Sequence, residues 1–172
     1  VEAIVGDASE TYRAIETEIR RELQQHTDIH ATFVSSNRID DIVARLHAQR
    51  GRFVFLTTLG SVTDRAGRTL TLPETIKAIV NAGHFVVFSM EDAYLYPGVL
   101  GGYVTSGPRQ GRAAAGLLIR HLNGVAVSAL PPIETSPNEY IIDESELLKA
   151  GFVLPGDIAT EATLVNPLPS FY

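Results

Sequence analysis

The chain has 172 residues, 45% of them hydrophobic, and a mean hydropathy of +0.09. These values predict a folded protein with a substantial core and exclude an intrinsically disordered chain. The net charge of -6 and the scattered positions of lysine and arginine exclude a nucleic-acid-binding protein and a protein that binds anionic lipid.

Cysteine is absent, which excludes disulfides, thiolate catalysis and cysteine-based zinc sites and leaves the cellular compartment open. No apolar run approaches the roughly 20 residues of a membrane span, and no leader-like segment precedes Val1. Because the sequence begins within a predicted strand, we expect it to be a piece of a longer protein.

Four short apolar runs, rich in β-branched and aromatic residues, predict buried strands. They are residues 3–6, 30–34, 53–56 and 84–88. Amphipathic patterns between them predict helices at residues 11–26, 39–50 and 72–83. Ser9 or Asp7 is the expected cap of the first helix and Asn37 that of the second, whereas Pro73 and Gly83 bound the third.

This alternation of buried strands and helices predicts a parallel sheet flanked by helices, an α/β lobe of flavodoxin-like type. Ligands bind such sheets at the carboxyl ends of the strands. The segments that follow the predicted strands are GDASE, SSN, TTLGSVTD and SMEDAY. We expect these polar segments to converge on one edge of the sheet.

After Pro97 the pattern changes. It predicts a strand and loop at 98–107, a helix at 111–124, a strand at 138–143, a short helix capped by Asp143 and a loop-like tail from residue 154 onward. We therefore divide the chain into an α/β lobe at residues 1–92 and a second part at 93–172. The second part contains a crossover strand and helix, a return strand and the C-terminal tail.

Motifs of catalysis and of cofactor binding are missing from the sequence. There is no G-x-S-x-G elbow, no H-E-x-x-H pair among the five histidines, and no Walker or Rossmann pattern in GGYVTSGPRQGR. We predict no catalytic residue, no cofactor and no metal site. The amides around Gly107 fit either a weak site for polar or anionic groups or, as the favoured interpretation, an ordinary helix cap.

Two further loops have alternative interpretations. Ser61 and Thr63 are able to bind a ligand through their hydroxyl groups, although such hydroxyls in loops are usually solvated. Glu91 and Asp92 either hold a ligand amine and perturb each other's ionisation or form an exposed acidic loop. An acidic and aromatic group of residues at strand ends suits recognition better than catalysis.

The order of several segments carries more information than any single motif. These are VEAIVGDASE, FVFLTTLGSVTD, HFVVFSMEDAYLYPGVLGGYVTSGPRQGRAAAGLLIRHLNG and PNEYIIDESELLKAGFVLP. Together they resemble the ABC-transporter substrate-binding-protein-like family of periplasmic binding proteins, most specifically in G-Y-V-T-S-G-x-x-x-G-R-A-A-A. More narrowly, they resemble the copies that serve as extracytoplasmic sensor domains of bacterial histidine kinases and diguanylate cyclases, in which a segment like NPLPSFY precedes the membrane helix.

The resemblance implies two α/β lobes joined by hinge strands, with a small-molecule ligand between them. Residues 1 to about 90 match the second lobe, residues 98–124 the excursion into the first lobe, and NEYIID the return. We therefore expect a lobe before Val1 that was either removed or is supplied by a symmetry partner. Domain exchange in a homodimer is one way to supply it.

Carried onto this sequence, the resemblance implies a set of ligand-binding residues that orient an unidentified ligand through hydrogen bonds. They are Asp7, Ser9, Thr58, Gly60, Ser61, Ser89, Glu91, Thr105 and Ser106. The predicted function is a periplasmic sensor domain of a signalling protein anchored in the inner membrane. The alternatives are a substrate-binding component of an ABC transporter and a cytosolic flavodoxin-like enzyme or regulatory domain.

Overall fold

The computed structural model describes residues 2–167, whose strands form one sheet in the order β2-β1-β3-β4-β5-β6-β7. The strands are β1 (Glu2–Gly6), β2 (Ala31–Ser35), β3 (Phe53–Leu56), β4 (Val86–Ser89), β5 (Val99–Val104), β6 (Glu139–Asp143) and β7 (Thr163–Val165). The α-helices are α1 (Glu10–Leu23), α2 (Ile39–His47), α3 (Leu72–Val80), α4 (Gly107–Leu122), α5 (Glu144–Ala150) and α6 (Gly156–Glu161). Short 3-10 helices are η1 (Asp92–Tyr94) and η2 (Val127–Ala129).

The predicted α/β class with a parallel sheet is confirmed for β1 to β5, which are mutually parallel. Strand β6 runs antiparallel to β5 because the chain turns back after α4, and β7 is parallel to β6. The sheet continues without interruption past residue 92. The division of the chain at this residue stays a prediction.

Three local predictions were wrong. Helix α2 has Arg38 at its N-cap rather than Asn37, and no side chain caps it. Helix α4 begins at Gly107, earlier than predicted, with a proline in its first turn. The C-terminal segment contains α6 and β7 instead of a loop, because β7 pairs with β6, a partner that local patterning does not reveal. Within the NPLPSFY segment, residues 168–172 lie outside the described part.

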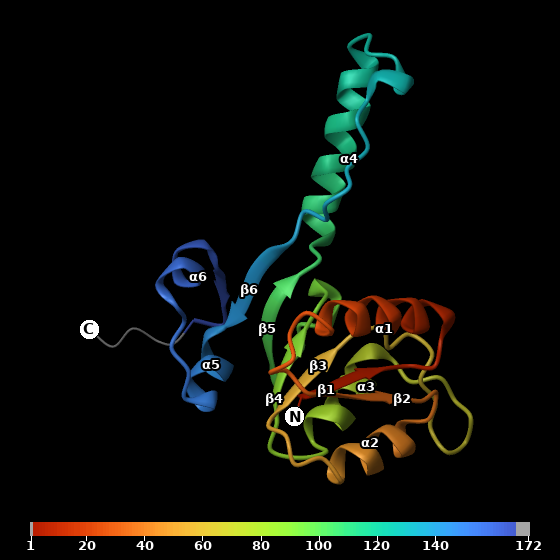
Figure 1. The fold of residues 1–172 in the computed structure, drawn as a ribbon, viewed down its shortest axis with the longest axis vertical. Coiled ribbons are helices and arrows are strands. Elements are labelled where there is room, and N and C mark those ends of the chain that lie inside the picture. Colours follow the sequence, from red (N-terminus) through yellow and green to blue (C-terminus); the bar gives the residue numbers. More distant parts are fainter. Residues whose placement is uncertain (1, 168–172) are drawn as a thin grey trace.

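Alternate residues of the central strands point to opposite faces of the sheet. On one face, Val54 and Val87 belong to a core cluster with Ile42 of α2 and Ile76 of α3. The opposite face is covered by α1 and, further along the sheet, by α5, whose Leu147 packs with phenylalanines of β3 and β4. The sheet therefore has helices on both faces (Figure 1).

The contact between β1 and α1 depends on a glycine. Tyr12 of α1 is 1% exposed, and its ring lies directly over Gly6 at the end of β1. A Cβ atom on Gly6 would overlap this ring and would lie 2.7 Å from Oγ1 of Thr57. The close approach sets the position of α1 beside the carboxyl end of the sheet.

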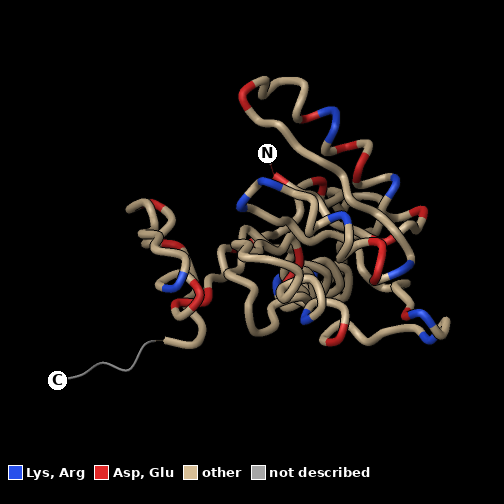
Figure 2. Tube along the Cα trace, turned by 90° about the horizontal axis from the view of Figure 1, so that it is seen from below, with Lys and Arg blue, Asp and Glu red and all other residues tan. Residues whose placement is uncertain are grey.

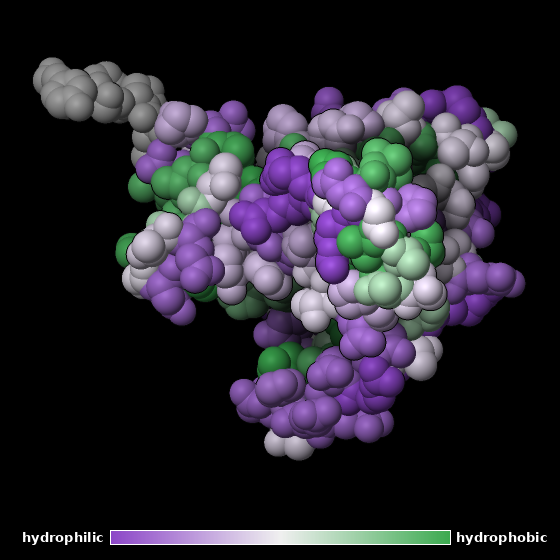
Figure 3. All heavy atoms as spheres, turned by 90° about the horizontal axis from the view of Figure 1, so that it is seen from above, coloured by the Kyte–Doolittle hydropathy of each residue, from purple (hydrophilic) through white to green (hydrophobic). Residues whose placement is uncertain are grey.

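A long arm projects from this lobe. We use the word arm for residues 105–138, which contain α4 and the chain that returns along it to β6 (Figure 1). Helix α4 has no buried residue, and Leu118, Ile119 and Leu122 are 57%, 57% and 73% exposed. Figure 3 looks down on this side of the molecule and shows apolar residues at its surface beside polar ones.

We predict that Gly6→Ala lowers the free energy of unfolding by about 1–3 kcal/mol, because the new methyl group must displace the Tyr12 ring. Urea denaturation followed by circular dichroism measures the loss. Gly116→Ala in exposed α4, where a Cβ atom meets nothing, is the matched control and should leave stability unchanged or slightly raised. Equal stability of Gly6→Ala and the native protein would contradict the prediction.

Candidate functional site

The nine predicted ligand-binding residues all lie at the carboxyl ends of four neighbouring parallel strands. We call this side of the sheet the carboxyl edge. Asp7 and Ser9 follow β1, and Thr58, Gly60 and Ser61 follow β3; Ser89 ends β4 and is followed by Glu91, and Thr105 and Ser106 follow β5. Parallel pairing brings these ends together because every strand ends on the same side.

The carboxylate of Asp7 joins the loops after β1 and β3. Asp7 is 1% exposed, and its Oδ2 accepts hydrogen bonds from the Ser61 amide at 3.1 Å and the Ser61 hydroxyl at 2.9 Å. Its Oδ1 accepts from the amide of Ser9 at 3.0 Å. Because these donors supply partners to a buried charge, Asp7 stabilises the edge rather than projecting free toward a ligand.

Asn37, which follows β2, joins the same group. Its Oδ1 accepts a hydrogen bond from the Ala8 amide at 2.8 Å and lies 3.4 Å from the Ser61 hydroxyl. Sequence reasoning placed Asn37 in a segment expected at this edge but assigned it to helix capping. Its position after β2 was the signal that placed Asn37 correctly at the carboxyl edge. The capping role was wrong because no side chain forms a capping hydrogen bond at the start of α2.

The ends of β4 and β5 are joined through backbone and side-chain bonds. The Thr105 amide donates to the Met90 carbonyl at 2.9 Å, and Glu91 pairs with Thr105 in a parallel bridge. The hydroxyl of buried Ser89 donates to the Glu91 carbonyl at 2.6 Å and accepts from the Glu91 amide at 3.0 Å. This local turn fixes the backbone of Glu91 and occupies the Ser89 hydroxyl.

The amides expected at the start of α4 are all occupied. Oδ2 of Asp92 accepts the N–H of Gly107 at 2.8 Å. Ser106 accepts the N–H of Arg109 through its hydroxyl at 3.4 Å and that of Gln110 through its carbonyl at 2.9 Å. The remaining residue of the first turn is a proline, which has no N–H. The helix-cap interpretation is confirmed, and the interpretation as a free anion site was wrong because Asp92 already fills that position.

The side chain of Glu91, unlike those of Asp7 and Asp92, is not held by hydrogen bonds within the described residues. It is half-buried, and no hydrogen bond or ion pair holds its carboxylate among the residues that the structure describes. Burial, and secondly the charge of Asp92, raise its pKa. Tyr94 is buried beneath this region; its hydroxyl accepts from the Leu59 amide at 3.3 Å, and burial, with smaller contributions from Glu91 and Asp7, raises its pKa.

The remaining predicted residues divide into occupied and available groups. The hydroxyl of Ser9 accepts from the Tyr12 amide at 3.1 Å and thus caps α1, as predicted. Gly60 and Ser61 are exposed at the rim. Oγ1 of Thr58 is buried and has no hydrogen-bond partner within residues 2–167. Buried polar atoms rarely lack a partner, so Oγ1 of Thr58 and the carboxylate of Glu91 stand out among the nine predicted residues.

The described residues contain neither a metal-binding cluster nor a membrane-spanning helix. No group of three or more histidine, aspartate or glutamate side chains there has the arrangement of a metal site. Within residues 2–167, every helix is too short or too polar to span a lipid bilayer.

We predict that Asp7→Ala lowers the free energy of unfolding by about 2–4 kcal/mol, because the amides of Ser9 and Ser61 lose a charged acceptor in a buried position. Urea denaturation measures the change. Asp28→Ala, at an exposed position between α1 and β2, is the control and should cost less than about 0.5 kcal/mol. A cost for Asp7→Ala as small as that of the control would contradict the assigned role.

We predict the opposite sign for Glu91→Gln. A carboxyl group with a raised pKa destabilises the folded state once pH exceeds its unfolded pKa of about 4.3, so removing the charge should stabilise the protein at pH 7 by less than about 1 kcal/mol. The gain should vanish below about pH 4, where the group is protonated in both states. Thermal unfolding at both pH values, with exposed Glu22→Gln as the control, measures it; a loss of stability at pH 7 would refute the assignment.

Comparison with known proteins identifies the fold. No family model and no curated protein matches the chain. The solved structures that match it include an ABC domain in complex with L-Trp from Streptococcus pneumonia (TM-score 0.62, 13% identity), a conserved domain protein from Vibrio cholerae (0.59, 14%) and a ligand-free, open substrate-binding protein with adhesive properties from Clostridium difficile (0.62, 16%).

Each alignment covers 95% of this chain but only 54–55% of the matched structure. The chain thus spans about half the length of the proteins it matches. At these identities the likeness concerns the fold, and the fold part of the resemblance drawn from the sequence is confirmed. The chain has the periplasmic-binding-protein-like α/β fold of substrate-binding proteins, over the half of their length that it shares.

Proposed function

We propose that this chain is a non-enzymatic domain that binds a small molecule at the carboxyl edge. The observation that carries the proposal is the half-buried carboxylate of Glu91, which has no partner within residues 2–167, whereas the neighbouring carboxylates of Asp7 and Asp92 are held by hydrogen bonds. An uncompensated charge costs stability, so its presence is explained when a ligand supplies the partner. The orphaned Oγ1 of Thr58 has the same explanation.

The ligand class follows from charge. Glu91, Asp92 and Asp7 place three carboxylates at this edge, and those of Asp7 and Asp92 already have donors. The Glu91 carboxylate suits a ligand with a positively charged amine, to which it accepts charge-assisted hydrogen bonds. The Streptococcus pneumonia neighbour was solved in complex with L-Trp, an amine-bearing amino acid. We propose an amino acid or a related amine as the ligand.

We further propose that a second lobe, in a longer protein, closes over the carboxyl edge. Two exposed apolar surfaces support it, one on the arm that begins at this edge and one beside Met90, which follows β4. One is the exposed face of α4, with Leu118, Ile119 and Leu122. The other is a shallow groove of about 500 Å³ between the outer face of α1 and Met90, lined by Ile15 and Ile19. Exposed apolar surfaces of this kind are typical of interfaces.

The role that we propose for the whole protein is an extracytoplasmic sensor domain of a histidine kinase or diguanylate cyclase in the inner membrane. Ligand would shift the balance between open and closed lobes, and the C-terminal segment would transmit the shift. The alternative is a transporter substrate-binding component. Sequencing the coding region outward separates them: a membrane span and signalling domain downstream of Tyr172 favour the sensor, and an early stop codon with a lipoprotein leader upstream favours transport.

We predict that an amino acid or amine, from a panel that also contains sugars, nucleobases and carboxylates, raises the melting temperature of the two-lobe protein saturably and forms no product. Glu91→Gln should weaken binding of that compound at least about tenfold through loss of the ion pair. Glu22→Gln, on α1, is the control and should bind normally. Selective binding of anions, or undiminished binding by Glu91→Gln, would refute the proposed ligand class.

A separate prediction concerns the arm. Replacing both Leu118 and Leu122 by Gln should change the stability of the 172-residue chain by less than about 0.5 kcal/mol, because both side chains are exposed. In the two-lobe protein the same change should weaken ligand binding, because it removes apolar contacts between the lobes. Calorimetric titration of the two proteins tests this, and an unaffected ligand affinity would refute the proposed contact.

A further inference from the structure

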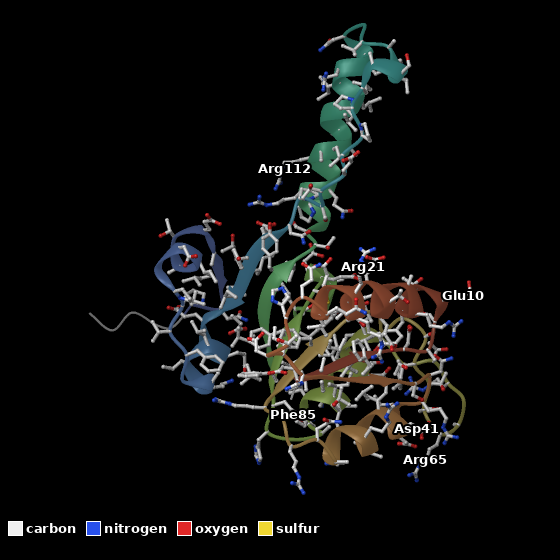
Figure 4. The ribbon with its side chains drawn as sticks, viewed as in Figure 1. Glu10, Arg21, Asp41, Arg65, Phe85 and Arg112 are labelled. Atoms are coloured by element: carbon white, nitrogen blue, oxygen red, sulfur yellow. The ribbon has the colours of Figure 1, made fainter. Side chains whose placement is uncertain are left out.

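A second pocket lies at the opposite end of the sheet from the carboxyl edge. It has a volume of about 310 Å³ and is lined by residues at the amino ends of β4 and β5, by Arg52 before β3, and by α5. Figure 4 places Phe85, one of its lining residues, at the lower end of the lobe, whereas Arg112 marks the base of the arm at the upper end. The length of β4 separates this pocket from Glu91.

Arg52 is fixed in a geometry that leaves donors free. Its Nη2 donates to the carbonyl of Ala150 at 2.6 Å, and its guanidinium lies 5.0 Å from the centre of the Phe152 ring. Within the described residues no other hydrogen bond holds this side chain, so Nε, Nη1 and the second hydrogen of Nη2 are available. Whichever Nη2 hydrogen Ala150 takes, the other one forms a parallel donor pair with either Nε or Nη1. A guanidinium held at one nitrogen and by an aromatic ring is preorganised to bind a carboxylate or phosphate through two parallel hydrogen bonds.

Two further nitrogen-bearing side chains, His84 and Lys149, line the same pocket. Nζ of Lys149 donates a hydrogen bond to Oε1 of Glu146 at 2.8 Å and keeps other hydrogens that are able to bind an anion. Glu146 is the one acidic residue that lines the pocket, and Lys149 is its ion-pair partner. The protein is acidic overall, and basic and acidic residues are interspersed along the chain (Figure 2). The convergence of Arg52, His84 and Lys149 is therefore a local feature and not a consequence of general charge.

We propose that this pocket is a binding site for a small anion with paired oxygens, a carboxylate or a phosphate, distinct from the carboxyl edge. The volume lies at the small end of the range for ligand pockets, about 300–1,000 Å³, which favours a compact anion. Arg52 supplies the bidentate contact, and Lys149 and His84 supply further donors from different elements.

The position of the pocket gives the anion a structural consequence. Arg52 and His84 belong to the lobe, whereas Lys149 belongs to α5 of the C-terminal segment. An anion that contacts both sides links α5 to the sheet, in addition to the hydrogen bond from Arg52 to Ala150 and the packing of Leu147. Occupancy thus stabilises the docking of the C-terminal segment, independently of any ligand at the carboxyl edge.

The test titrates sodium phosphate and sodium citrate into the protein at constant ionic strength, with sodium chloride as the reference. Constant ionic strength removes general screening of surface charges from the comparison. We expect saturable binding of one or both probes by calorimetry, with a Kd of the order of 1 mM, and a rise in melting temperature that chloride does not produce. Binding of phosphate alone or of citrate alone identifies the anion class.

Variants locate the site. Arg52→Gln should weaken binding about tenfold or more, and Lys149→Gln, which keeps the bond from Arg52 to Ala150, about threefold. Arg50→Gln, an exposed arginine outside the pocket, is the matched control and should bind normally. If Arg52→Gln fails to fold, Lys149→Gln decides. The absence of saturable binding, or unchanged binding by Lys149→Gln and by any folded Arg52→Gln, overturns the proposal.

Discussion

The buried carboxylate of Asp7 holds together the loops on which the carboxyl edge depends. It accepts both donors of Ser61 from the loop after β3 and the amide of Ser9 at the start of α1. Asn37 ties the loop after β2 to the same group, because its Oδ1 accepts a hydrogen bond from the Ala8 amide. Because a buried charge without partners is costly, these bonds restrict the loops to one arrangement. The edge is thus largely organised before any ligand arrives.

The polar groups of the carboxyl edge that lack hydrogen-bond partners indicate where a ligand would bind. Asp92 and Ser106 occupy the amides at the start of α4, which removes the anion site that the glycine-rich segment suggests. Glu91, one residue before Asp92, has no such partner within residues 2–167, and burial raises its pKa. Binding sites commonly retain a charged group that lowers the stability of the folded protein, even where the neighbouring polar groups are all hydrogen-bonded. The negative character of the edge favours a cationic ligand group.

The two ends of the sheet have different chemistry. Carboxylates and hydroxyls gather at the carboxyl edge, and exposed apolar surfaces lie on the arm that begins there and on α1. At the amino ends, Arg52, His84 and Lys149 surround a compact pocket at the joint with α5. We propose that the domain binds one ligand at the carboxyl edge and another where its C-terminal segment docks. The separation by the length of β4 makes the two proposals independent.

The sequence by itself determined the elements whose signals are local. Short apolar runs predicted β1 to β4. The polar segments that follow these runs predicted the carboxyl edge, because parallel strands that alternate with helices must end on the same side of the sheet. Ser9 and Asp143 were predicted as caps because the bond from an N-cap side chain spans only three residues. The binding roles of the nine residues stay a prediction.

Only the tertiary structure decided which polar groups find partners. The bond from the Gly107 amide to Asp92, the bond from the Ala8 amide to Asn37 and the pairing of β7 with β6 join positions whose separation along the chain carries no periodic signal. The unpaired state of Glu91, the exposure of the arm and the pocket at Arg52 likewise depend on long-range packing. Local patterns specify what each segment is able to form, and the folded arrangement alone specifies which of its groups remain available to bind.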